Sequence, residues 1–68
     1  MKLKAGLYRA RNGKKHLIFH KDGLSDHWPW CNSTGQTWTI KGCIVSGISN
    51  PDDLIERLSK EDYPEEYL

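Results

Sequence analysis

The sequence lacks the segments that direct a chain into a membrane or out of the cell. The first four residues are followed by Gly6, Tyr8 and Arg9, where a secretory signal would carry an apolar core. No apolar run approaches the roughly 20 residues that a membrane-spanning helix needs. We therefore expect a cytoplasmic protein with no membrane partner, in which the thiols of Cys31 and Cys43 stay reduced.

Residues spaced for catalysis or metal binding are missing as well. The candidate nucleophiles and bases are His16, His20, His27, Cys31, Cys43 and Ser46. No spacing links two of them as a nucleophile and its base, and a chain of 68 residues has little room for a pocket that excludes water. The chain has no Cys-x2–4-Cys pair typical of zinc sites, and offers only His27-x3-Cys31 followed by Cys43. We expect a non-enzymatic protein without metal or cofactor.

Charge is unevenly distributed along the chain. Residues 1–30 contain seven basic and two acidic side chains, a net charge of +5, whereas residues 31–68 contain three basic and seven acidic ones, a net charge of −4. Such asymmetry either serves a partner or draws the two halves together in the folded monomer. The chain is short enough for one small domain, whose core we expect to consist largely of its three Trp, three Tyr and one Phe.

The clearest structural signal is a β-hairpin over residues 6–20, which we expect to end before a turn at Lys21-Asp22-Gly23. Asn12-Gly13 between two strand-like runs is typical of a two-residue type I′ turn, in which both residues have positive φ. This turn would pair Arg11 with Lys14, Arg9 with His16, Tyr8 with Leu17, Leu7 with Ile18 and Gly6 with Phe19. The pairing predicts an apolar face of Tyr8, Leu17 and Phe19 and a basic face of Arg9, Arg11, Lys14 and His16.

Trp28-Pro29-Trp30 predicts an aromatic edge segment, because proline cannot donate a hydrogen bond to a neighbouring strand. In an extended chain the two Trp side chains point the same way. They either pack on the first hairpin or are exposed, where they would stack on a base, a ligand or a partner's side chain.

A second hairpin is expected from residues 36–40 and 43–46, with its turn at Lys41-Gly42. The turn is either a simple two-residue turn or a bulged one with Gly42 at positive φ. In the predicted pairing Trp38 opposes Val45, and Ile40 opposes Cys43 as a small buried side chain.

Asn50-Pro51-Asp52-Asp53 has the composition of a helix start, with Asn50 as the N-cap. Leu54, Ile55 and Leu58 would then form the apolar stripe of a short helix. The predicted fold class is α+β, a small antiparallel curled sheet or SH3-like barrel of 4–5 strands with a short C-terminal helix. We place this single domain at residues 1–60, followed by an acidic tail at 61–68 that either docks or stays solvated.

Five motifs follow one another in a fixed order. They are Gly-x-Tyr-Arg-x-Arg-x-Gly-Lys at 6–14, an apolar strand at 17–19, a proline between aromatics at 28–30, Trp-x-x-x-Gly at 38–42 and Asn-Pro-x-Asp-Leu at 50–54. This order resembles a loose group of small, mostly uncharacterised proteins of tailed phages and prophages. Asn12 stands where that pattern more often has Asp, and Cys31 and residues 61–68 lie outside it. The resemblance covers most of residues 6–58 and implies a phage or prophage product acting inside a bacterium, without supplying an activity.

These features together favour a phage or prophage accessory protein that binds a host macromolecule, such as a defence or replication protein, and blocks or redirects it. The predicted binding residues are Arg9, Arg11, Lys14, His16, Trp28 and Trp30, since Trp and Arg are frequent in interface hot spots. The alternative is that the basic hairpin face binds a phosphorylated small molecule, such as a nucleotide, or single-stranded nucleic acid. A third hypothesis is a homodimer in which the Trp28-Pro29-Trp30 edge pairs across a two-fold axis.

Overall fold

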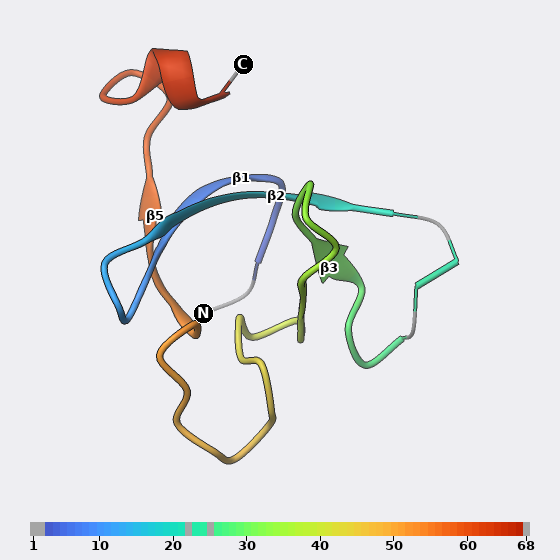
Figure 1. Cartoon of the computed structure of the whole chain (residues 1–68). Coiled ribbons are helices and arrows are strands. Elements are labelled where there is room, and N and C mark those ends of the chain that lie inside the picture. Colours follow the sequence, from blue (N-terminus) through green and yellow to red (C-terminus); the bar gives the residue numbers. More distant parts are fainter. Residues whose placement is uncertain (1–2, 22, 25, 68) are drawn as a thin grey trace.

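The computed structural model describes residues 3–21, 23–24 and 26–67, so Asp22 of the predicted turn and Leu68 of the predicted tail lie outside the described residues. It contains a five-stranded antiparallel sheet with the order β4-β3-β2-β1-β5 (Figure 1). The strands are β1 (Gly6–Ala10), β2 (Lys15–His20), β3 (Trp30–Cys31), β4 (Thr37–Trp38) and β5 (Leu54–Leu58). One 3-10 turn, η1 (Pro64–Tyr67), follows β5.

The sheet curls because the chain after β4, the strand at one end of the sheet, returns to form β5 at the other end. The backbone N–H of Leu54, at the start of β5, donates to the carbonyl of Gly42 at 2.9 Å. The N–H of Leu3 donates to the carbonyl of Ile40 at the same distance. These two hydrogen bonds link the two ends of the sheet and confirm the predicted small, curled antiparallel sheet.

The core lies inside this curl and is centred on Trp38, which has no exposed surface. The other buried members of the cluster are Leu3, Tyr8, Ala10, Ile18 and Leu54, with Trp30 and Ile44 packed against it. The indole N–H of Trp38 is satisfied by the carbonyl of Asp52 at 2.9 Å, as a buried indole requires. Of the seven aromatic residues expected to form most of the core, only Tyr8 and Trp38 belong to this buried cluster, and the rest of the cluster is aliphatic, so that expectation is wrong.

Three loops close in the same way, and each uses a glycine. In the loops at 10–14, 32–36 and 39–43, the backbone N–H of the first residue donates to the carbonyl of the last residue. The N–H of the glycine at the fourth position donates to the carbonyl of the first residue. The glycines have φ of 87°, 90° and 86°. This is the pattern of a type I turn followed by a bulge whose residue must be left-handed, and glycine occupies that position at no steric cost. The bulged alternative predicted for Gly42 is therefore confirmed.

The predicted register of the first hairpin is wrong by one residue. Asn12 does not have positive φ, so the loop contains three residues instead of the two of a type I′ turn. In the observed register Leu7 opposes Leu17, and Tyr8 opposes His16. A shift of one residue moves every side chain of β2 to the other face. Phe19, predicted to be in the core, is consequently 40% exposed.

The predicted C-terminal helix is wrong, because residues 54–58 form strand β5 beside β1. Asn50 and Pro51 start a reverse turn, in which the side chain of Asn50 accepts from the N–H of Asp52 and its carbonyl accepts from the N–H of Asp53. Asparagine and proline favour such a turn as strongly as a helix start. The only helical piece among the described residues is η1.

A bulge in β5 explains why its two leucines are both buried. The register against β1 shifts between Arg9 and Ala10, so that Leu54 opposes Ala10 while Leu58 opposes Leu7. Leu54 joins the core inside the curl. Leu7 and Leu58 lie outside that cluster and are also buried, on the side where η1 contacts β1. The described part of the predicted acidic tail therefore docks on the sheet.

The second hairpin and the aromatic edge differ from the predictions. β4 pairs with β3, and Cys43 lies opposite Thr39 at the end of a bulged loop, so the predicted pairs of Trp38 with Val45 and Ile40 with Cys43 are wrong. Cys43 is half-buried. β3 lies between β2 and β4 and is not an edge. Pro29 is accommodated because it directly precedes β3, where no ladder hydrogen bond is required.

Candidate functional site

The predicted basic residues of the first hairpin do not share one face. Arg9 opposes Lys15 on β2, whereas His16 opposes Tyr8, so the side chains of Arg9 and His16 lie on opposite sides of the sheet. Arg11 lies in the loop, and Lys14 closes it. The one-residue shift in register is the cause, since the predicted basic face required Arg9 to oppose His16.

Arg9 and Arg11, two of the four predicted residues, interact with acidic residues from the C-terminal half, as does the neighbouring Lys15. Arg9 lies 3.9 Å from the carboxylate of Glu56 and donates to the hydroxyl of Tyr63 at 3.2 Å. Arg11 lies 3.9 Å from the carboxylate of Asp53. On the side of η1, Lys15 forms an ion pair with Glu66 and lies over the ring of Tyr63. Three basic residues of the positive half, Arg9, Arg11 and Lys15, thus lie within 4 Å of a carboxylate from the negative half of the same chain.

His16 is half-buried and is held by its neighbours. Its ring lies 5.0 Å from the Trp38 ring, and its Nδ1 is 3.2 Å from the side-chain nitrogen of Asn32. The Asn32 oxygen already accepts from Thr34 and Gln36, so the Asn32 amide donates to Nδ1 and the histidine proton is on Nε2. Nε2 is buried and has no hydrogen-bond partner among the described residues. Burial lowers the pKa of His16, so the ring is neutral at pH 7.

The two tryptophans of the 28–30 segment have different environments. Trp30 is half-buried against the core and makes an edge-on contact with the ring of His20 at 5.6 Å. Trp28 is 37% exposed, and its indole N–H donates to the carbonyl of Ile44 at 2.8 Å. This hydrogen bond fixes the indole, and the remaining surface of Trp28 is open to a partner.

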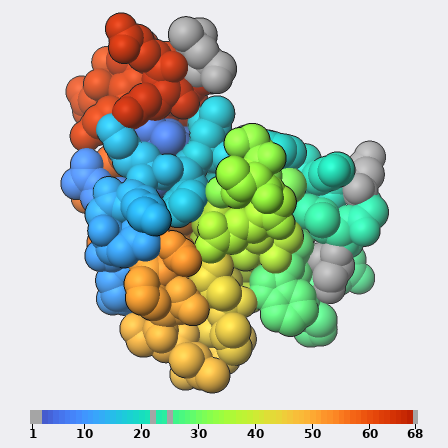
Figure 2. All heavy atoms as spheres, in the orientation of Figure 1, coloured from blue at the N-terminus to red at the C-terminus, as the bar shows by residue number. Residues whose placement is uncertain are grey.

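Trp28 lies in the wall of a surface groove of about 480 Å³, which we call the Trp28 groove. Its lining residues are Asp26, His27, Trp28, Thr39, Ile40, Lys41, Val45 and Ser46. Ile40 and Val45 are 48% and 42% exposed, so its exposed surface includes aliphatic side chains as well as an indole. In Figure 2 the green wall around residue 28 and the yellow-green to yellow loop that follows β4 are neighbours on the surface. The volume is in the range of a binding pocket for a short peptide or small ligand.

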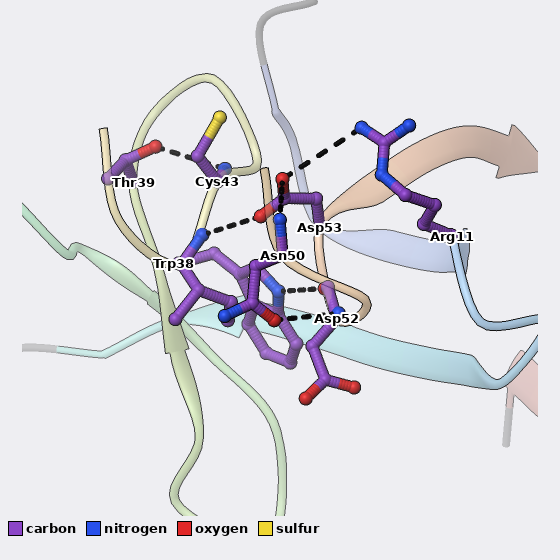
Figure 3. A network of polar contacts seen from close by, with 8 residues as sticks. Arg11, Trp38, Thr39, Cys43, Asn50, Asp52 and Asp53 are labelled. Carbon is purple, nitrogen blue, oxygen red and sulfur yellow. Dashed lines mark hydrogen bonds and ion pairs between the residues drawn. The ribbon is translucent and has the colours of Figure 1, made fainter. Parts of the chain in front are cut away.

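A buried carboxylate holds the loop that forms the second wall of this groove. Asp53 is 5% exposed and accepts from the N–H of Ile44 and from the N–H of Asn50, each at 3.0 Å (Figure 3). Arg11 approaches the same carboxylate from the first hairpin. The carboxylate of Asp53 therefore links Ile44, the neighbour of Val45 in the groove wall, to Arg11 of the first hairpin.

A second depression, of about 560 Å³, lies over the outer side of the first hairpin. It is lined by Leu7, Gly13, Lys14, Lys15, His16, Leu17 and Glu66. Lys15 is already paired with Glu66 there. Lys14 forms no ion pair in the part of the chain that the structure describes, and it is the one predicted basic residue that is free to meet an anion.

No group of three metal-binding side chains occurs among the described residues. Cys31 is buried and Cys43 is half-buried, and both are free cysteines. Within the same residues, no helix has the length and apolar composition needed to cross a membrane.

Sequence reasoning named Trp28 but missed the aliphatic half of the groove. Ile40 and Val45 were assigned to a paired hairpin, where alternate side chains would be buried. The sequence signal that could have identified them is the glycine at position 42, because a bulged loop there ends the strand before Ile40.

Comparison of the chain with protein-family models, with curated proteins and with solved structures gave no match.

Proposed function

We propose that this protein is a non-enzymatic binding domain that docks a host bacterial protein through the Trp28 groove and thereby blocks or redirects it. The observation that supports the proposal is the groove itself. It places a fixed indole beside two aliphatic side chains that are more than 40% exposed. Exposed apolar surface of this kind on a small domain is characteristic of interaction sites.

The context of this proposal is the resemblance of the motif order to that of small phage and prophage proteins, which suggests action in the cytoplasm of an infected or lysogenic bacterium. The curled sheet agrees with the proposed resemblance to an SH3-like barrel. Domains of that type bind extended peptides in grooves lined by aromatic side chains. The indole N–H of Trp28 is already used by Ile44, so the groove offers a partner apolar contact more than hydrogen bonds.

The experiment is a pull-down from bacterial lysate with the tagged protein and two charge-introducing variants. Ile40→Glu places a carboxylate in the groove, and Ile55→Glu places one at an equally exposed isoleucine on β5. We expect a stoichiometric host protein with the wild type and with Ile55→Glu, and its loss with Ile40→Glu. A clean preparation without a stoichiometric partner, or equal capture by both variants, contradicts the proposal.

The second candidate function is binding of a phosphorylated small molecule or single-stranded nucleic acid by the first hairpin. The observation in its favour is the depression around Lys14, whose ammonium group forms no ion pair with the described residues. Titration with nucleotides and oligonucleotides at low salt, followed by Trp fluorescence, tests it, because Trp38 contacts the ring of His16 on the inner face of β2, whose outer face lines the depression. Unchanged emission throughout, or the same change in Lys14→Gln, rejects this candidate.

A further inference from the structure

Beside the Trp28 groove, the chain forms a protruding apolar turn at residues 45–48. The N–H of Ile48 donates to the carbonyl of Val45 at 3.2 Å, and the two residues form an isolated antiparallel bridge. Ile48 is 63% exposed, more than any other large apolar side chain among the described residues. Its neighbours at 46, 47 and 49 are Ser, Gly and Ser, so the turn carries no charge. An uncharged turn with an aliphatic side chain fits an apolar groove.

The turn and the groove share Val45, which lines one and begins the other. We infer that the protein forms a homodimer about a two-fold axis, in which the Ile48 turn of each copy occupies the Trp28 groove of the other. A turn and a groove on one surface form such an isologous interface, because the same contact is made twice and the assembly closes at two copies. This inference goes beyond the proposed function, since it requires no host partner, and a host protein would bind the monomer in competition with the second copy.

The charges at the groove are compatible with a second copy as the occupant. Asp26 and Lys41 both line the groove, and neither forms an ion pair within the part of the chain described by the structure. A rim with one carboxylate and one ammonium group has no net charge. Such a rim does not repel its own two-fold copy, whereas a rim of one sign would.

The exposed area indicates a weak dimer. Covering the exposed parts of Trp28, Ile40, Val45 and Ile48 on both copies removes on the order of 700 Å² from water, which is below the roughly 1,000 Å² expected of a stable specific contact. Interfaces of this size exchange readily. We expect monomer and dimer to coexist in a concentration-dependent equilibrium.

The test is sedimentation of the whole chain from about 10 µM to about 1 mM, which brackets the affinity of a small interface. The variants are Ile48→Glu in the turn, Ile40→Glu in the groove and Ile55→Glu on β5 as the matched control. We expect dimers in the wild type and in Ile55→Glu, with association at least about tenfold weaker in the other two. Circular dichroism of each variant checks that its fold is retained.

A direct readout comes from an equal mixture of isotope-labelled and unlabelled protein. Contacts between the Ile48 methyl groups of one copy and the Trp28 indole of the other are expected in isotope-filtered NMR spectra. A monomer at every concentration overturns the inference but leaves the host-protein proposal standing, because the groove is then open. A dimer that persists in Ile48→Glu, or that lacks the Ile48–Trp28 contact, uses another surface and equally overturns it.

Discussion

Replacing Asp53 with alanine is expected to remove a large part of the stability of this domain. The carboxylate is 5% exposed and accepts from the N–H groups of Ile44 and Asn50. Hydrogen bonds to a charged group contribute about 1.5–3 kcal/mol each, and water reaches the two half-buried donors in the variant, so we expect a loss of about 2–3 kcal/mol. A domain of 68 residues has a total free energy of unfolding of roughly 3–10 kcal/mol.

The loss can be measured by urea unfolding followed by tryptophan fluorescence, to which the buried Trp38 contributes; its indole N–H is bonded to the neighbouring carbonyl of Asp52. With a slope near 1 kcal/mol per molar urea, the midpoint should fall by about 2–3 M. Arg11→Gln is the control. Its guanidinium is 54% exposed and 3.9 Å from Asp53, so we expect a loss below about 1 kcal/mol. If Asp53→Ala unfolds within about 0.5 kcal/mol of the wild type, the carboxylate does not hold the loop, and the reasoning from its hydrogen bonds is wrong.

Two further predictions concern the turns and the pH dependence. Gly13→Ala should lower the free energy of unfolding by about 1–2 kcal/mol because of its φ of 87° alone, since nothing lies within 4 Å of the added methyl group. Gly42→Ala should lower it distinctly more, because two leucine atoms lie 3.3 Å from the added methyl group. Equal urea midpoints for the two variants would contradict this. Burial lowers the pKa of His16, so the unfolded chain binds more protons, and stability should fall as the pH drops below about 6.5 towards the lower folded pKa. His16→Gln should flatten this part of the profile; a wild type of constant stability between pH 7 and about pH 5 would refute the assignment.

The hairpin over residues 6–20 could be predicted from its sequence, but its register could not. Asn-Gly favours both a two-residue and a three-residue loop, and the two differ by one residue in pairing. The choice is made by the rest of the chain. With the observed register Ile18 enters the core and Phe19 remains 40% exposed, and the space inside the curl is filled by Trp38. The sequence of β2 allows either of its faces to be buried, so it does not determine which face packs against the core.

The helix predicted after Asn50 failed for a similar reason. Asparagine followed by proline satisfies local hydrogen bonds in a turn as well as at a helix start, so local chemistry does not decide between them. Leu54 and Leu58 have the spacing of one helical turn, which suggested a single apolar stripe. The β-bulge at residue 55 instead places them on opposite faces of β5, where each is buried. The free edge of β1 offers hydrogen bonds to residues 54–58 when they are extended, and this favours a strand. It is a tertiary effect that the periodicity of the sequence does not predict.

The candidate site was predicted in part. Trp28 was named as a binding residue, and it is exposed in a groove; Trp30, named with it, packs against the core. The indole of Trp28 is fixed by a carbonyl that lies 16 residues further along the chain. Contacts at this separation depend on the loop after β4, whose path is set by the buried carboxylate of Asp53. Neither contact has a local signature in the sequence.

The predicted basic face and the Trp28 groove differ in what a ligand must displace in order to bind. Arg9, Arg11 and Lys15 each lie within 4 Å of a carboxylate from the C-terminal half, so a phosphate-bearing ligand would have to displace these carboxylates before it gained its own contacts. At the groove, by contrast, Trp28 and Val45 are already exposed. A partner that covers them gains about 25 cal/mol for each Å² of apolar surface removed from water and breaks no existing ion pair. Part of the charge asymmetry of the sequence is therefore used in contacts within the fold, and the exposed apolar surface of the groove is available to a partner.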